Sequence, residues 1–148
     1  MSRSAGCRRA HPAHHDDRRH VAHRRPVMRG LGIDAVDIAR FSAALVRSPR
    51  LAARVFTANE RESAARRADS DAMLAARFAV REATMKALGV GLGAFDFHDV
   101  SVRSDAGGRP SLQVSGRAAR LAHERGVTNW HVSLTHTDNL AVAVVAAE

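Results

Sequence analysis

The longest patterned stretch of the chain is residues 71–88, where apolar side chains recur at the spacing of a helix. Much of its predicted buried stripe comes from Met73, Leu74, Phe78, Met85 and Leu88. Ser70 or Asp71 is placed to cap the start of this helix, and Gly89 is placed to end it. The pattern therefore predicts one long amphipathic helix.

Shorter patterns predict further elements before this helix. Residues 28–33 indicate a brief strand, and a helix is expected over about residues 37–47, with its apolar side chains on one face. Thr57 and Glu60 form a capping-box pattern, which predicts a helix over about residues 58–67.

After the long helix, alternation between apolar and polar residues predicts antiparallel strands. Residues 97–103 and 111–114 read as the two strands of a hairpin, a helix is expected over about 116–125, and two closing strands over about 129–135 and 140–147. Helices followed by antiparallel strands indicate an α+β domain.

Charge separates the start of the chain from the rest. Residues 1–27 hold seven Arg and two Asp, so that +5 of the formal net charge of +8 lies there, and they show no periodicity. We expect a disordered basic extension, or a leader from a wrongly assigned start, followed by one domain over residues 28–148. No apolar run is long enough for a membrane helix or a secretory signal, so a cytoplasmic protein is expected.

Aromatic residues make up only 4% of the chain against 45% hydrophobic residues, so the core is expected to consist of small aliphatic side chains. Lysine is rarer still, because Lys86 is the only one in a chain with many arginines.

Three local patterns carry candidate chemistry. Asp34 follows the first predicted strand, where a carboxylate can act as a ligand or simply cap the next helix. Glu82 and Lys86 stand four apart on one face of the long helix, either as a solvated ion pair or as part of a site. Alternation in residues 130–136 gives one polar face to an otherwise apolar strand, which suits an edge strand or a site.

The stretches around these residues resemble the two signatures of the 4′-phosphopantetheinyl transferases, in their small holo-acyl-carrier-protein synthase branch. The stretches read GIDAVDIAR over residues 32–40 and RFAVREATMKA over residues 77–87, and WHVSLTH over residues 130–136 is similar to the closing motif of that branch. The resemblance covers about residues 30–147. It implies the α+β fold of the family, in which a small antiparallel sheet packs with helices, one of them long.

The resemblance also implies a reaction. The family transfers 4′-phosphopantetheine from coenzyme A to a serine of an acyl carrier protein, releases 3′,5′-ADP and supports fatty-acid or polyketide synthesis. By motif position, Asp34 and Glu82 would hold Mg²⁺, and Lys86 would lie beside them at the breaking pyrophosphate. The serine proton would pass to Glu82 or to a water.

Other residues match binding positions of the family. The residues matched to the coenzyme are Arg77, Lys86, Arg109, Pro110, Thr135 and His136. Arg40 matches a position that binds an acidic carrier protein, and Arg47 would extend that basic patch. The family branch is typically a homotrimer with sites between subunits. The chain departs from the family at Arg81, where Lys is usual, and at Asp37, where a longer acid is common; both changes alter side-chain reach.

Two other functions fit part of the sequence. The Arg-rich extension would suit a nucleic-acid-binding module, although residues 28–148 carry only +3 of the net charge and have no aromatic stacking surface. A non-catalytic subunit of the same fold could bind carrier proteins. The presence of Asp34, Glu82 and Lys86 together favours the enzyme over both.

Overall fold

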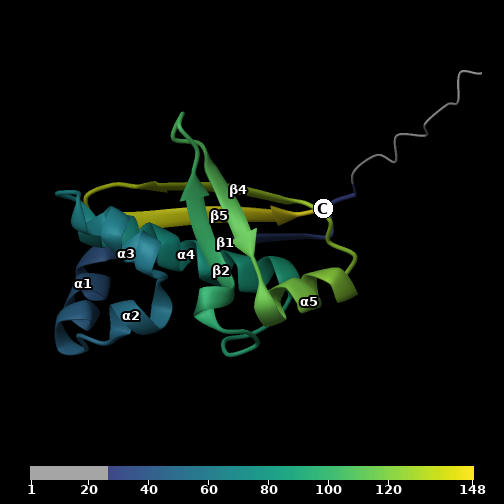
Figure 1. The fold of residues 1–148 in the computed structure, drawn as a ribbon, viewed down its shortest axis with the longest axis horizontal. Coiled ribbons are helices and arrows are strands. Elements are labelled where there is room, and N and C mark those ends of the chain that lie inside the picture. The colour runs from purple at the N-terminus through teal and green to yellow at the C-terminus, as the bar shows by residue number, and fades with distance from the viewer. Residues whose placement is uncertain (1–26) are drawn as a thin grey trace, which may run out of the picture.

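The structure, a computed structural model, describes residues 27–148 (Figure 1). The predicted extension over residues 1–27 lies, apart from its last residue, outside the described part. The elements are, in chain order, β1 (Gly30–Asp37), α1 (Ile38–Arg47), α2 (Leu51–Val55), α3 (Ala58–Ala65), α4 (Ser70–Leu88), the 3₁₀ helix η1 (Phe97–Asp99), β2 (Val100–Ser104), β3 (Pro110–Val114), α5 (Gly116–Glu124), β4 (Trp130–His136) and β5 (Leu140–Ala147).

The long helix α4 organises the molecule. A three-stranded antiparallel sheet, in the order β1-β5-β4, packs along it, and β2 of the separate β2-β3 hairpin contacts another part of its surface. The hairpin crosses the direction of the three-stranded sheet in Figure 1, and β3 also contacts β4. Helices α1 and α3 pack against α4 as well. The result is an α+β fold around one central helix.

Two glycines let β1 approach α4 closely. A Cβ atom added at Gly30 would collide with the carbonyl oxygen of Ala87, and one added at Gly32 would collide with that of Ala83. Alternate residues of a strand share a face, so Asp34 points toward the same side of β1 as these two glycines. The backbone contact therefore fixes how far the Asp34 side chain stands from α4.

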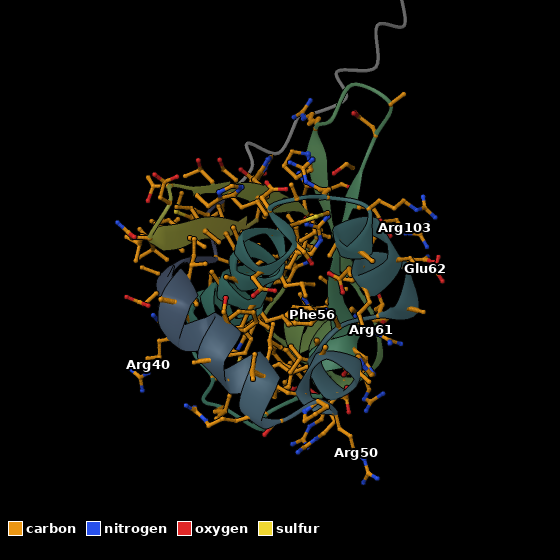
Figure 2. The ribbon with its side chains drawn as sticks, turned by 90° about the vertical axis from the view of Figure 1, so that its left-hand side faces the viewer. Arg40, Arg50, Phe56, Arg61, Glu62 and Arg103 are labelled. Carbon is orange, nitrogen blue, oxygen red and sulfur yellow. The ribbon has the colours of Figure 1, made fainter. Side chains whose placement is uncertain are left out.

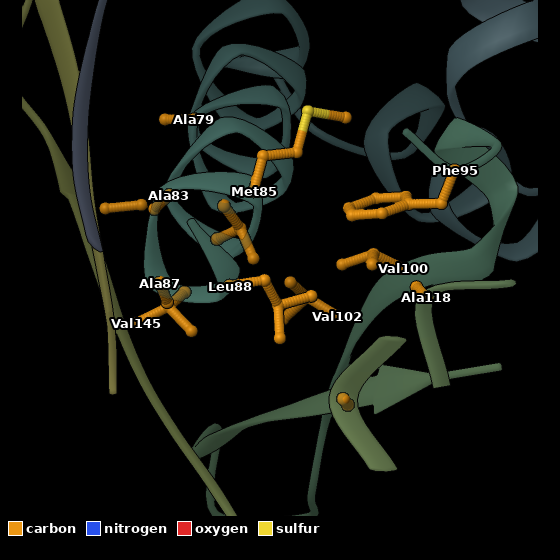
Figure 3. Close-up of a cluster of buried hydrophobic side chains, with 13 residues drawn as sticks. Ala79, Ala83, Met85, Ala87, Leu88, Phe95, Val100, Val102, Ala118 and Val145 are labelled. Atoms are coloured by element: carbon orange, nitrogen blue, oxygen red, sulfur yellow. The ribbon is translucent and has the colours of Figure 1, made fainter. Parts of the chain in front are cut away.

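Small aliphatic residues fill the core, as the composition predicts. Most of the buried hydrophobic residues are Ala or Val, and alanines such as Ala79 and Ala83 face β1 and β5 while Met85 faces Phe95 and the hairpin (Figure 3). Small side chains shorten the distance between the helix and the sheet. Close packing of this kind maximises dispersion contacts without large side chains.

Most predicted elements are confirmed, including the capping box of α3, in which Thr57 accepts from the backbone of Glu60 and the Glu60 side chain accepts from the backbone of Thr57. Gly89 ends α4 in the left-handed conformation, at φ 64°. The stripe predicted for α4 is too narrow, because this helix is buried on several sides and even Arg77 and Arg81 are buried.

Two local predictions are wrong, and one helix was not predicted. The first strand does not end before Asp34 but continues to Asp37, because β5 pairs with its whole length. Residues 97–99 form the 3₁₀ helix η1, since the Asp96 side chain accepts from the backbone N–H of His98 and begins a turn there. Helix α2, only five residues long, has no periodicity that could predict it.

Within residues 27–148, no helix has both the length and the apolar character required to cross a membrane.

Candidate functional site

Asp34 lies inside strand β1, and its side chain faces helix α4. The Nζ atom of Lys86 donates to Asp34 Oδ1 at 2.8 Å and to the backbone oxygen of Ile33 at 3.0 Å. The capping alternative for Asp34 is wrong, since Asp37 caps α1 by accepting from the backbone N–H of Arg40 at 2.8 Å. The Asp34 carboxylate therefore does not cap a helix and can bind a ligand.

Glu82 lies one turn before Lys86 on α4 and shares a cavity with Asp34. Burial raises the pKa of Glu82, the Asp34 carboxylate raises it further by repulsion, and the Lys86 ammonium only partly opposes them. Among the described residues, Lys86 forms its ion pair with Asp34 of β1 and not with Glu82 on its own helix. Two neighbouring carboxylates with one ammonium leave a net negative charge, which favours a bound cation.

The cavity beside Asp34 and Glu82 has a volume of about 590 Å³. Its other walls come from β1, α1, α2, α4 and β5 and are largely apolar, including Phe41 of α1, Leu51 of α2 and Phe78 of α4, and Arg40 also lines it. The carboxylates therefore lie at the polar end of a hydrophobic recess.

The donor set fits Mg²⁺ better than a metal held by protein ligands alone. Within the described residues, no three side chains of His, Cys, Asp or Glu gather as a metal cage. Mg²⁺ is commonly bound by one or two carboxylates, with waters and substrate phosphates completing its shell. Asp34 and Glu82 provide such a pair of carboxylates.

A second cavity, of about 340 Å³, brings together most of the residues matched to the coenzyme. Arg77 of α4, Pro110 of β3, and Thr135 and His136 of β4 all line it. Arg109 does not; it is exposed and lines a different hollow with Trp130 and His131. The β2-β3 turn explains this, because the Arg109 backbone N–H donates to Asp105 Oδ1 at 2.9 Å and the residue belongs to the turn.

A third, adjoining cavity of about 580 Å³ is strongly basic. Its lining includes Arg66, Arg67, Arg77 and Arg103, together with several hydroxyl and amide side chains. The sequence patterns did not identify Arg66, Arg67 or Arg103 as candidates, because arginine is so common in this chain that residue type does not distinguish them. The two adjoining cavities share Arg67 and Arg77, so they form one basic region suited to an anion.

His136 is held at the mouth of this region by an acidic side chain that the sequence patterns did not single out. The Nε2 atom of His136 lies 3.3 Å from Asp69 Oδ2. Arg67 makes a bidentate contact with the same carboxylate: its Nε donates to Oδ1 at 2.7 Å and its Nη2 donates to Oδ2 at 2.9 Å. The hydrogen bond from Arg67 lowers the pKa of Asp69 to about 2. Asp69 therefore stays ionised and holds Arg67 and His136 together.

The acidic and the basic regions lie on different sides of α4. Glu82 and Arg77 are five residues apart, which at 3.6 residues per turn separates them by about 140° around the helix axis. Glu82 lines the cavity with α1 and α2, and Arg77 lines the cavities with α3, the hairpin and β4. One chain thus presents an acidic and a basic region on different sides of α4.

The face of the three-stranded sheet turned away from α4 is partly apolar and open. Leu31 and Ile33 of β1 are each 59% exposed. Ile33 pairs with Val144 of β5, which pairs in turn with Ser133 of β4, so the apolar row passes into the polar face predicted for residues 130–136. Exposed apolar patches of this kind on a sheet commonly mark protein contacts.

The residues predicted to bind the carrier protein lie on α1. Arg40 and Arg47 are both exposed, and Arg50 follows just before α2. Arg40 and Arg50 extend away from the body of the molecule (Figure 2). Arg40 also borders the cavity of Asp34 and Glu82, so a partner bound to α1 would reach that cavity.

Comparisons with known proteins point to one family. Residues 30–145 match the family model described as the 4′-phosphopantetheinyl transferase superfamily. The chain is 47% identical over 119 residues to a holo-[acyl-carrier-protein] synthase of Frankia casuarinae, covering 80% of this chain and 96% of that protein. Among solved structures, it superposes on the holo-[acyl-carrier-protein] synthase of Neisseria meningitidis with a TM-score of 0.75 and 27% identity, covering 82% of this chain and 99% of that one. It also superposes on a holo-(acyl-carrier-protein) synthase from Bacillus anthracis in complex with CoA (3′,5′-ADP), with a TM-score of 0.67 and 32% identity, covering 81% of this chain and 96% of that one.

Proposed function

The chain belongs to the 4′-phosphopantetheinyl transferase superfamily, in its holo-[acyl-carrier-protein] synthase group, and on that premise we propose how its residues perform the reaction. The enzyme transfers the 4′-phosphopantetheine of coenzyme A to a serine hydroxyl of an apo acyl carrier protein. The serine hydroxyl gives its proton to Glu82 or to a water, its oxygen forms a bond to the β-phosphorus, the pyrophosphate bond breaks, and 3′,5′-ADP leaves.

The observation that carries the proposed mechanism is the convergence of Asp34, Glu82 and Lys86. A strand and a helix distant in sequence bring the two carboxylates to one cavity, and the only lysine of the chain pairs with Asp34 beside it. Asp34 and Glu82 are the residues that would hold Mg²⁺, which supplies polarisation of the pyrophosphate when bound. Lys86, half exposed at 53%, can turn its ammonium from Asp34 toward phosphate oxygens. There it would offset the negative charge that grows on the leaving group.

The basic region is the proposed site for the nucleotide end of coenzyme A. Arg77, Thr135 and His136 offer a guanidinium, a hydroxyl and an imidazole to phosphate oxygens. The complex of the Bacillus anthracis relative with CoA (3′,5′-ADP) supports a nucleotide site on this fold. Arg109 is the weakest member of the proposed set, since it lies outside the cavity that the others line.

A homotrimer would unite the two half-sites. Since the acidic and basic regions of one chain open on different sides of α4, a neighbouring subunit could supply the half that each lacks. The open apolar face with Leu31 and Ile33 supports an interface there, because its burial would remove exposed hydrophobic surface from water.

Arg40 and Arg47 are the proposed contacts for the acidic carrier protein. Both are exposed on α1, and Arg40 borders the cavity that holds the proposed catalytic groups. Opposite charges would speed the encounter, and binding should weaken with salt. The cytoplasmic location predicted from the sequence stays a prediction.

The proposed function is tested by incubating the purified protein with Mg²⁺, coenzyme A and an apo acyl carrier protein, and then weighing the carrier by mass spectrometry. A gain of one phosphopantetheine is expected, and EDTA should prevent it. A carrier that binds the protein but never gains mass, with several carriers tried, would favour the non-catalytic subunit instead. Titration with Mg²⁺ after EDTA tests the metal separately.

A further inference from the structure

Arg81 lies at the centre of the molecule, fully buried, and its guanidinium is completely engaged. Its Nη1 and Nη2 donate to the two carboxylate oxygens of Glu60 at 3.2 and 2.7 Å, and its Nε donates to the backbone oxygen of Phe97 at 2.9 Å. Nη1 also donates to the backbone oxygen of Arg77 at 3.1 Å, and the ring of Phe56 lies 5.0 Å away. Arg81 is therefore held rigidly between α3, α4 and η1.

The Glu60 carboxylate is equally constrained. Besides Arg81, it accepts from the backbone N–H and hydroxyl of Thr57, at 3.0 and 3.1 Å, and from the backbone N–H of Val102 at 3.3 Å. Burial alone would raise the pKa of Glu60, but the bonds from Arg81 and the backbone outweigh it and lower the pKa. Glu60 is thus a fixed buried anion at a defined position.

Arg77, the third residue of this group, has guanidinium N–H donors that are not used by the protein residues described. Only 10% of its side chain is exposed, and its Nε lies 3.8 Å from Glu60 Oε1, too far for a hydrogen bond. This buried Nε has no hydrogen-bond partner among the described residues. Arg77 lines both basic cavities, so its unused donors border a space that a ligand can enter.

The charges of the three residues explain why the group is open to an anion. Two guanidiniums and one carboxylate leave one positive charge in a buried place. Glu60 attracts Arg77 but is already shared by Arg81 and the backbone, so it orients Arg77 without occupying its donors. A buried charged donor without a partner is unfavourable until something accepts from it.

We infer that Glu60 and Arg81 are positioning residues that hold the Arg77 guanidinium ready for a phosphate group. The inference rests on the proposed function, in which Arg77 meets the 3′-phosphate of coenzyme A. Arg81 fixes Glu60, Glu60 orients Arg77, and Arg77 touches the ligand. Neither Glu60 nor Arg81 lines the cavity of Asp34 and Glu82, where the proposed chemistry at the pyrophosphate takes place.

The test compares coenzyme A with 3′-dephospho-coenzyme A, which lacks the phosphate that Arg77 would hold. The leading variant is Glu60→Asp, which keeps the charge and withdraws the carboxylate from Arg77. It should raise the KM for coenzyme A about five-fold or more, leave kcat within about two-fold, and change the KM for the dephospho form less than two-fold. Arg81→Lys keeps a cation against Glu60 but loses the two-pronged contact, so it should shift the ratio of the two KM values in the same direction as Glu60→Asp.

A matched control is Glu62→Asp, the same change two residues along α3 on its exposed side (Figure 2). It should change neither KM. If Glu60→Asp raises both KM values equally, or changes neither, the positioning role is refuted and the Glu60 pair with Arg81 is purely structural.

Arg77→Gln separates this inference from the proposed function. It should remove the preference for coenzyme A over the dephospho form, and Glu60→Asp should then add no further effect. If Arg77→Gln leaves the preference intact, the proposed phosphate contact fails and the positioning role fails with it. If Arg77→Gln removes the preference but Glu60→Asp does not reduce it, only the positioning role is overturned.

A measurement on the wild-type protein covers the case in which Glu60→Asp does not fold. NMR of the arginine side chains without coenzyme should show a slowly exchanging Nε–H for Arg77, because this N–H is buried and the guanidinium is held beside the Glu60 carboxylate. Adding 3′,5′-ADP should shift that signal, and adenosine 5′-monophosphate should shift it far less. A rapidly exchanging Arg77 signal in the free protein would contradict the inference.

Discussion

Lys86 Nζ lies 2.8 Å from Asp34 Oδ1, so the only lysine of the chain pairs with a carboxylate 52 residues away rather than with Glu82 one turn back on its own helix. The pair spans β1 and α4, and it joins the two sequence signatures into one site. Its geometry depends on the close approach of these two elements at Gly30 and Gly32.

Removing the Asp34 carboxylate should abolish transfer without unfolding the protein. Asp34→Asn keeps the shape of the side chain but lowers its affinity for a cation, and a loss of several kcal/mol of transition-state stabilisation corresponds to roughly a thousand-fold fall in kcat. Mass spectrometry of the carrier measures the activity, and circular dichroism checks the fold. Asp138→Asn, in the exposed turn between β4 and β5, is the control and should retain activity. A folded Asp34→Asn enzyme with normal kcat would exclude the proposed role.

Lys86→Arg keeps the charge but changes its reach and shape. We expect kcat to fall at least about ten-fold, because a guanidinium cannot occupy the position of the ammonium between Asp34 and the phosphate. Steady-state kinetics at saturating coenzyme measure the change. The control is Arg120→Lys, which exchanges the same two residue types on the exposed side of α5 and should leave kcat unaltered. Wild-type activity in Lys86→Arg would refute a geometric role for this lysine.

Gly32→Ala should destabilise the fold strongly. The new Cβ would meet the carbonyl oxygen of Ala83, which belongs to the α4 backbone and cannot move alone. We expect a loss of about 3 kcal/mol in the free energy of unfolding, as for an overpacked core, measured by urea denaturation. Gly91→Ala, where an added Cβ meets nothing within 4 Å, should change the free energy of unfolding by less than about 0.5 kcal/mol. Equal stability of the two variants would disprove the packing constraint.

The Asp69 carboxylate should contribute to stability in a way that depends on pH. Its pKa is about 2 in the folded protein against an ordinary value of 3.8, so its contribution is present above pH 3.8 and is lost as the pH falls from 3.8 to about 2. The difference in unfolding free energy between the wild type and Asp69→Asn should shrink over this interval and vanish near its lower end. Chemical denaturation at several pH values measures it. A difference that stays constant down to pH 2 would mean that Arg67 does not hold Asp69 ionised.

The exposed sheet face should control assembly. Ile33→Glu places a charge on the open face of β1, and we expect the mass in solution to fall from three chains to one, as measured by light scattering during size-exclusion chromatography. Transfer activity should fall with it, because the two half-sites would separate. Leu92→Glu changes another exposed apolar residue, on the loop after α4, and should leave the proposed trimer intact. A fully active Ile33→Glu monomer would show that one chain contains the whole site.

Local chemistry in the sequence was enough to predict most elements of the fold. The capping box of Thr57 and Glu60, the left-handed stop at Gly89 and the alternation of residues 130–136 each depend on interactions within a few residues. Interactions of this kind depend little on the rest of the structure, so they can be predicted from the sequence. The end of β1 was mispredicted because it depends on pairing with β5, more than 100 residues away.

The sequence by itself determined the candidate residues Asp34, Glu82 and Lys86, because motif positions identify residues without needing coordinates. Only the tertiary structure decided their partners: Lys86 with Asp34, Arg81 with Glu60, and Arg77 between two cavities. In a chain with 22 arginines, residue type cannot distinguish a buried guanidinium from a solvated one. That distinction depends on which side chains meet across elements, and so on the packing of α3, β1 and the hairpin around α4.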